Sequence, residues 1–167
     1  MVQSLGSSET SSDSERARGV KYWLAVATED NCSALAQIGY PFYALNWVPK
    51  VLCGDRCIFY RSGNRRGFIG AFEFVSGDLK DPIRLGDHRV FVTRLPLKPL
   101  VISDQDPVEI APLIDKLEFI TAKANYSMSL RNSFRSIPEA DYLLVVREIK
   151  RRSKAKRKSR SHKNLPK

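Results

Sequence analysis

Residues 54–77, GDRCIFYRSGNRRGFIGAFEFVSG, contain the strongest structural signal of the chain. Two apolar, β-rich runs, CIFYRSG (57–63) and GFIGAFEFVSG (67–77), are separated by a short polar link. The GD and SGN sequences before and after the first run are typical of turns. The runs therefore predict two strands paired as a hairpin. Gly67 and Gly70 favour a bend or a close neighbour, and the apolar density of the second run indicates a central strand of a closed or nearly closed sheet.

Two elements are predicted before this hairpin. VKYWLAVA (20–27) is a short apolar run that predicts the first strand of the folded part, and Thr28 is a suitable N-cap for a short helix ending near Gly39. PFYALNW (41–47) predicts an aromatic extended segment after its proline.

Strand and helix signals follow the hairpin. HRVFVTRLPLKPLVI (88–102) is interrupted by Pro96 and Pro99, which predicts an edge strand or two short strands. PVEIAPLIDKLEFI (107–120) has apolar residues at helical spacing, and PEADYLLVVREIK (138–150) predicts a last helix entered through a proline. Short strands followed by helices predict an α+β domain, a compact β-barrel with helices packed against it.

Basic residues are concentrated at the C-terminal end. Residues 150–167 hold 10 of the 28 Lys and Arg and none of the 18 Asp and Glu, so residues 1–149 carry 18 cations and 18 anions. A segment with so much like charge and so little apolar surface is predicted to stay disordered until it meets an anionic partner. Nucleic acid is the partner we expect, and a solubilising tail without a defined partner is the alternative.

The chain is therefore divided into three parts. Its 167 residues suit one domain with a real core, over residues 20–149. Residues 1–19 are rich in Ser and predict a flexible N-terminal segment, and residues 150–167 form the basic disordered tail.

Several classes of protein are not favoured. The N-terminal stretch has no basic start followed by an apolar run, and no window of 18 apolar residues occurs, which predicts a cytoplasmic protein without a membrane partner. The odd number of cysteines argues against a disulfide framework, and Cys53 and Cys57 lack nearby histidines, so neither metal nor cofactor is predicted. No triad, two-carboxylate pair or nucleotide-binding glycine motif can be drawn, so no enzyme is predicted.

A second informative stretch is KANYSMSLRNSFRSIPEADY (123–142), just before and into the last predicted helix. It mixes aromatic rings, hydroxyls and basic residues, which makes it too polar for a core helix and too apolar for a plain loop. This mixture indicates the wall of a pocket.

In their order, the motifs of residues 20–146 resemble the EVE family of the PUA-like superfamily, which is related to YTH domains. The motifs that carry the resemblance are YWLAVA, the aromatic extended segment, GDRCIFYRSG, GFIGAFEFVS, RVFVTRLPLKPL, LIDKLEFI and NYSMSLRNSFRSIPEADY. The resemblance implies a PUA-like β-barrel with helices against it and a pocket between them. In EVE and YTH proteins that pocket is associated with nucleic acid, and in several members with modified bases in an aromatic cage.

The resemblance also assigns residues to the pocket. Tyr22 and Trp23 match the aromatic pair that opens the family, although at least one of them is expected to be packed, because alternate strand residues face opposite sides. Asn46 and Trp47 stand where relatives place a polar group and a cage ring. Two differences from the family pattern leave the assignment open. The connection between the aromatic segment and GDRC is shorter than in many relatives, so either Trp47 or Phe42 and Tyr43 face the pocket. In the aromatic-Ser-Met element, Tyr126 stands where a tryptophan is common.

The chemistry of the side chains, considered without the family, also predicts a site for a nucleotide base. A flipped base needs aromatic faces for stacking and a few hydrogen-bonding groups at its rim. The predicted base pocket consists of Trp23, Asn46, Trp47, Ser62, Tyr126, Ser127 and Ser129. Basic residues of the turn at 61–66, the segment at 131–135 and the tail are predicted to contact phosphates: Arg61, Arg65, Arg66, Arg131, Arg135, Lys150, Arg151 and Arg152.

The sequence thus predicts a non-catalytic nucleic-acid-binding protein whose pocket accepts a flipped, plain or modified base while the tail contacts phosphates. RNA and DNA, the modification and the oligomeric state are left open. The alternatives are a protein-interaction module with a non-specific basic tether and a pocket for a small anionic ligand.

Overall fold

The computed structural model describes residues 18–131 and 134–162. Most of the predicted N-terminal segment, residues 1–17, and the last part of the predicted tail, residues 163–167, lie outside the described residues. The elements, in chain order, are β1 (Tyr22–Thr28), α2 (Glu29–Gln37), β2 (Phe42–Leu45), β3 (Arg56–Ser62), β4 (Gly67–Phe74), β5 (Ile83–Arg84), β6 (Val90–Phe91), β7 (Thr93–Ile102), the 3₁₀ helices η1 (Ala111–Leu113) and η2 (Lys123–Leu130), β8 (Phe134–Ile137) and α3 (Glu139–His162).

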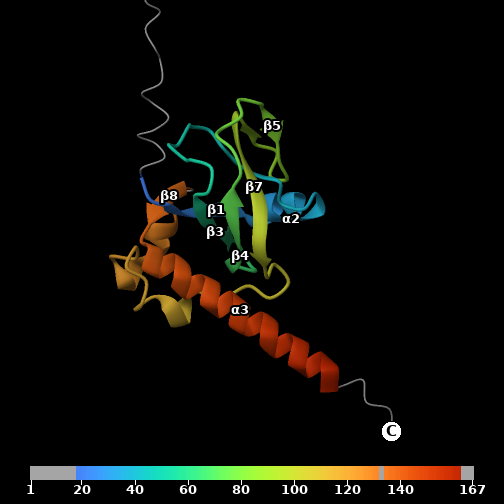
Figure 1. The fold of residues 1–167 in the computed structure, drawn as a ribbon, viewed down its shortest axis with the longest axis vertical. Coiled ribbons are helices and arrows are strands. Elements are labelled where there is room, and N and C mark those ends of the chain that lie inside the picture. Colours follow the sequence, from blue (N-terminus) through green and yellow to red (C-terminus); the bar gives the residue numbers. More distant parts are fainter. Residues whose placement is uncertain (1–17, 132–133, 163–167) are drawn as a thin grey trace, which may run out of the picture.

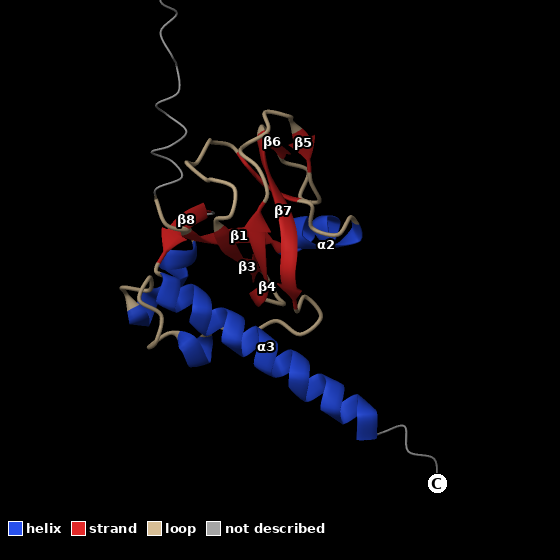
Figure 2. Ribbon diagram, in the orientation of Figure 1, coloured by secondary structure: helices blue, strands red, loops and turns tan. Residues whose placement is uncertain are grey.

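Six strands form one curled sheet in the order β2-β7-β4-β3-β1-β8 (Figures 1 and 2). β3 and β4 are antiparallel neighbours at its centre, which confirms the predicted hairpin. β1 lies parallel to β3 on one side and antiparallel to β8 on the other. The α+β class, with helices packed against a barrel-like sheet, is confirmed.

The prolines of β7 do not place it at an edge. β7 lies between β2 and β4, while β6 pairs with β5 in a separate small sheet. The predictions of an edge strand and of two short strands divided at the prolines are therefore both wrong, because Pro96 and Pro99 lie within the single strand β7 and the break with β6 falls at Val92. The ladder tolerates Pro99 because the register with β4 shifts at this point, between Ala71 and Phe72. Pro96 still contributes its carbonyl, which accepts the Val75 N–H at 3.1 Å.

Each face of the sheet has its own core because side chains alternate along the strands. On β3, Cys57 and Phe59 lie in a core shared with α2 and β2, whereas Ile58 and Tyr60 lie in a core covered by α3. Apolar residues on successive turns of α3 complete the second core: Tyr142, Val145 and Ile149.

One predicted helix forms and another does not. Thr28 caps α2 as expected, its Oγ1 accepting the Asn31 N–H at 3.3 Å. Residues 107–120 contain only the short 3₁₀ helix η1, so the longer helix is a wrong prediction. Asp141 of α3 accepts hydrogen bonds from the backbone N–H groups of Glu118 and Phe119 at 2.9 and 2.8 Å. These two donors therefore find their acceptor on another element and not within a helix of their own. Its apolar residues are buried by the non-local core rather than by a helix face.

The basic tail differs most from expectation. α3 continues to His162, and its second half extends past the sheet (Figure 2), so residues 150–162 are helical rather than disordered. The packed first turns provide the nucleus that a charged segment cannot form alone, and Lys, Arg and Ala are good helix formers. Within residues 18–131 and 134–162, no helix combines the length and apolar character needed to cross a membrane.

Candidate nucleic-acid interface

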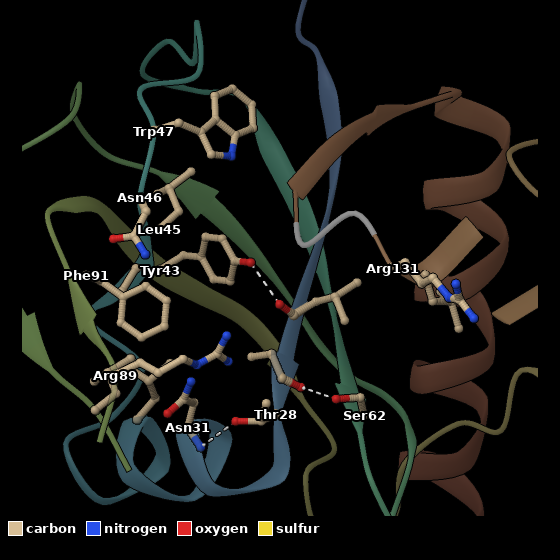
Figure 3. Close-up of a pocket in the computed structure, with 16 residues that line it drawn as sticks. Thr28, Asn31, Tyr43, Leu45, Asn46, Trp47, Ser62, Arg89, Phe91 and Arg131 are labelled. Carbon is tan, nitrogen blue, oxygen red and sulfur yellow. Dashed lines mark hydrogen bonds between the residues drawn. The ribbon is translucent and has the colours of Figure 1, made fainter. Parts of the chain in front are cut away.

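A pocket of about 340 Å³ opens at the ends of β1 and β2. The parallel pairing of β1 and β3 brings Thr28 opposite Ser62, so both strands end at the same side of the pocket. The remaining walls come from the start of α2, the end of β2, β6 and the segment after η2 (Figure 3). The lining residues are Val26, Ala27, Thr28, Asn31, Leu35, Tyr43, Ala44, Leu45, Asn46, Trp47, Ser62, Leu85, Arg89, Phe91, Leu130 and Arg131.

Aromatic rings make up much of the wall. The Tyr43 ring stacks on Phe134, with centroids 5.4 Å apart and planes at 27°, and its hydroxyl donates to the Val26 carbonyl at 2.8 Å. Phe91 is buried on the other side. Trp47 stands at the rim, 48% exposed, and touches Phe134 edge-on at 6.1 Å. Buried rings inside and an exposed indole at the rim offer stacking surface to a flat ligand.

A polar network lies on the side of the pocket formed by α2 and the turn before β6. The Asp87 carboxylate accepts from Asn31 Nδ2 at 3.0 Å and from Arg89 Nε at 2.7 Å. The Asp87 N–H donates to Asn31 Oδ1 at 3.0 Å, which fixes the orientation of the amide. Burial raises the pKa of Asp87, but the hydrogen bonds from Arg89 and Asn31 outweigh it and hold this pKa below its usual value. Asp87 therefore stays ionised and paired with Arg89.

Two predicted polar residues also line this pocket. Asn46 Oδ1 accepts a hydrogen bond from the Val92 N–H at 3.2 Å. This bond fixes the orientation of the amide, so that Nδ2, the donor group, lies on the side away from Val92. Ser62 donates its hydroxyl to the Ala27 carbonyl at 3.3 Å. The structure thus brings Asn46, Trp47 and Ser62 together, and both Trp47 and Tyr43 face the pocket while Phe42 does not line it.

Four predicted base-pocket residues lie elsewhere. Trp23 is buried in the core, stacked on Phe134 at 4.9 Å, with its Nε1 donating to Asp55 at 3.2 Å. Tyr126 packs against the core under α3, Ser127 donates to Asn125, and Ser129 is buried in η2. Their assignment to this pocket is corrected, because η2 turns toward the opposite face of the sheet and leaves only its end, Leu130, at the pocket.

The predicted phosphate-binding residues are divided among several positions. Arg61 is 6% exposed, its Nε donating to the Arg65 carbonyl at 2.7 Å, so it is a structural residue and not a surface contact. Arg65 and Arg66 are exposed at the hairpin tip. Arg131 is among the residues that line the pocket, on the side opposite Phe91, and its guanidinium points away from the other labelled side chains (Figure 3). Arg135 is on β8, and its guanidinium lies over the Phe119 ring.

The three basic residues predicted at the start of the tail lie on α3, not in a flexible segment. Lys150 and Arg151 are exposed, and Arg152 donates to the Pro107 carbonyl at 2.9 Å. Exposed charge continues along the projecting part of the helix through Lys154, Lys156, Arg157 and Lys158.

Sequence reasoning missed Asn31, Arg89 and Phe91. All three look ordinary in sequence: a polar residue in a helix, a charge after a GD turn and an apolar residue in a strand. The turn signal at residues 86–87 was the only hint, since Asp87 in that turn receives both polar side chains. Their meeting depends on how α2 packs beside β6.

The EVE domain family model matches residues 21–148. No curated protein matches the chain. Among solved structures, a hypothetical protein from Leishmania major is similar at 16% identity and a TM-score of 0.53, over 81% of this chain and 98% of that one. A protein from Rhodopseudomonas palustris has 22% identity and a TM-score of 0.49, over 78% and 93%. Human THYN1, solved with DNA containing 5-methylcytosine, has 12% identity and a TM-score of 0.39, over 75% and 95%. The match over most of the chain, together with the curled sheet and its helices, shows that the protein belongs to the EVE domain family and has its PUA-like fold.

Proposed function

We propose that this protein is a non-catalytic nucleic-acid-binding protein whose pocket accepts an extruded base, plain or modified, while the basic part of α3 contacts phosphates. The observation that carries the proposal is the pocket itself. It combines buried aromatic and aliphatic walls with a limited set of oriented polar groups, and its volume of about 340 Å³ is in the range of small-ligand sites.

The pocket suits a base better than a small anion. A base is a flat apolar ring with a polar edge, so it can place its faces against Tyr43, Phe91 and Trp47 and its edge toward Asn46 and Arg89. A free anion would gain little from the apolar walls and would lie near the ionised Asp87. Membership of the EVE family supports the same ligand class, since the pocket of EVE and YTH proteins is associated with nucleic acid.

Basic residues extend from the pocket region to the projecting helix. Ser62 ends β3 at the pocket, and the hairpin tip that follows carries Arg65 and Arg66. Arg65 Nη2 donates to the Gln105 carbonyl at 3.5 Å, and the same loop accepts Arg152 of α3 through Pro107. A strand whose base enters the pocket therefore meets positive charge along the hairpin tip and then along α3, and this contact is insensitive to sequence.

A protein-interaction module is the second candidate, favoured by apolar residues exposed beside the pocket. Val48, next to Trp47 in the chain, is 52% exposed, and Val90 and Val92, which flank the pocket residue Phe91, are 46% and 48% exposed. Such a patch can bind a protein partner. This candidate predicts that nucleic-acid binding depends on α3 alone.

Binding of the full chain to matched oligonucleotides tests the proposal. Each oligonucleotide carries adenine, methylated adenine, cytosine, methylated cytosine or an abasic residue at one position, and all are measured at one salt concentration so that the phosphate contribution is constant. We expect at least one base to bind more tightly than the abasic residue. Trp47→Ala is expected to reduce this advantage by about 1–3 kcal/mol, the usual value of one stacking contact.

Leu143→Ala is the matched control, because Leu143 is similarly exposed, at 47%, but lies on α3 outside the pocket. Equal affinity for the abasic and intact oligonucleotides, unchanged in Trp47→Ala, would reject base binding and leave the interaction module with a basic helix.

A further inference from the structure

Asp87 holds Arg89 by one side of its guanidinium. Arg89 Nε and Nη2 lie 2.7 and 2.6 Å from Asp87 Oδ2, and the Arg89 N–H donates to Oδ1 at 3.2 Å. Asn31 Nδ2 donates to the same Oδ2 at 3.0 Å, and Thr28 Oγ1 lies 3.4 Å from it. The carboxylate is thus tied to α2 and its cap, and it fixes the direction of the arginine.

The other side of the guanidinium faces the pocket. A guanidinium is a rigid planar fork, so engaging Nε and Nη2 leaves the end formed by Nη1 and Nη2 for a second bidentate contact. Within the described residues, Nη1 of Arg89 has no hydrogen-bond partner. Figure 3 shows this group pointing toward the centre of the pocket from beside Phe91, over whose ring it lies at 5.6 Å.

Charge and surroundings restrict what this fork can bind. Asp87 already neutralises Arg89, so a phosphate at the free end would lie near a carboxylate of its own sign. Beyond the polar network of Asn31 and Thr28, the pocket is lined by apolar side chains that include Leu45 and Phe91 and by the ring of Tyr43. A neutral, flat group with two adjacent acceptors satisfies the fork and the walls together.

Resting on the function proposed above, we propose that Arg89 is the specificity-determining residue of the pocket, held by Asp87 as a positioning residue, and that it selects bases with two adjacent acceptors. Guanine presents such a pair, N7 and O6, and cytosine presents N3 and O2. Adenine and uracil or thymine place a donor beside each acceptor of their exposed edges, so one arm of the fork would meet an N–H group. The Nδ2 group of Asn46 has no hydrogen-bond partner among the described residues and adds a further donor for such acceptors.

The experiment uses the full chain and short single-stranded oligonucleotides, as DNA and as RNA, in which one central nucleotide is flanked by abasic residues. The central base is guanine, cytosine, adenine, or thymine in the DNA and uracil in the RNA, with a fully abasic strand as the reference. We expect guanine, cytosine or both to bind about tenfold more tightly than adenine and thymine or uracil, as for one bidentate contact. 7-Deazaguanine, which lacks N7, distinguishes the acceptor pair of guanine from that of cytosine. Replacing guanine by 7-deazaguanine should abolish a preference for guanine, whereas the affinity for the cytosine strand is unaffected.

Two variants test whether the preference for guanine or cytosine comes from Arg89. Arg89→Lys keeps the charge but cannot form the fork, and Asp87→Asn releases it, so both are expected to lose the tenfold preference while still binding an intact base more tightly than the abasic strand. Arg84→Lys is the matched control, because Arg84 is an exposed arginine of β5 that donates to the His88 carbonyl and does not line the pocket.

The outcomes separate this inference from the proposed function. A base-dependent affinity that needs Trp47 but shows no preference for guanine or cytosine, or keeps it in Arg89→Lys, overturns the role of Arg89 and leaves the base pocket standing. No base-dependent affinity for any strand overturns both. The oligonucleotide series on the unchanged protein decides the base preference even if a variant does not fold.

Discussion

Asp55→Asn is expected to destabilise the fold by about 3 kcal/mol, because Asp55 is a buried carboxylate that collects donors from three segments. It is 2% exposed. Oδ1 accepts from Arg18 Nη1 at 3.3 Å and the Lys21 N–H at 3.0 Å. Oδ2 accepts from Arg18 Nη2 at 2.8 Å, Trp23 Nε1 at 3.2 Å and the Leu52 N–H at 3.1 Å.

An asparagine cannot serve this set. Whichever oxygen its NH₂ group replaces, at least one backbone N–H and one guanidinium nitrogen then face a donor. A buried donor without an acceptor costs about 1–3 kcal/mol, and the lost charge weakens the contact with Arg18. The effect reaches the pocket indirectly, because Trp23 stacks on Phe134, which in turn stacks on Tyr43.

The assay is urea unfolding followed by tryptophan fluorescence, with the m-value compared between proteins. Asp115→Asn is the control, because Asp115 is exposed, and we expect a change within about 0.5 kcal/mol. Burial raises the pKa of Asp55, but the bonds from Arg18, Lys21, Leu52 and Trp23 outweigh it and lower this pKa. The stabilisation is therefore present above the unfolded pKa of about 4 and lost as the pH falls through the folded pKa. Asp55→Asn should lack this part of the acid destabilisation, and a loss below about 1 kcal/mol at pH 7 would refute the reasoning.

Two further predictions concern the sheet and the helix. Gly70→Ala should destabilise by about 1–3 kcal/mol in urea unfolding, because its Cβ would meet the Val101 carbonyl oxygen at 2.7 Å; Gly77→Ala, with open space around the site, is the control, and an equal effect of both would contradict the packing argument. Replacing Lys154 and Lys158 of α3 by Gln should weaken binding to every strand alike and reduce the slope of log K against log salt by about 1.5, measured by anisotropy titrations. A change in base preference instead would place α3 at the base.

Local signals were enough for much of the fold. The hairpin of β3 and β4 was predictable because two continuous apolar, β-rich runs and the turn sequence between them act between neighbours in the chain. The start of α2 was predictable because Thr28 satisfies the Asn31 N–H within the same turn. The family could be inferred for a related reason, since a fixed order of such local motifs runs through most of the chain.

The sequence was a poorer guide where distant partners decide. Residues 107–120 have helical spacing, yet only a 3₁₀ turn forms, and the backbone N–H groups of Glu118 and Phe119 donate instead to Asp141, more than 20 residues further on. The charge of residues 150–162 predicted disorder, but the packed start of α3 allows the helix to continue through them.

The pocket shows the same division. Residue type alone predicted aromatic and polar groups, and it could not separate Trp47, which stands at the rim, from Trp23, which packs inside the core. Arg89 carries no local mark of function, because its direction is set by Asp87, which is itself held by Asn31 of α2, 56 residues before Asp87 in the chain. By itself the sequence determined the central hairpin, the first strand, the capped helix and the charge of the C-terminal region, since these depend on neighbours in the chain. Only the tertiary structure decided which side chains share the pocket, because that depends on strand pairing and helix packing between distant segments.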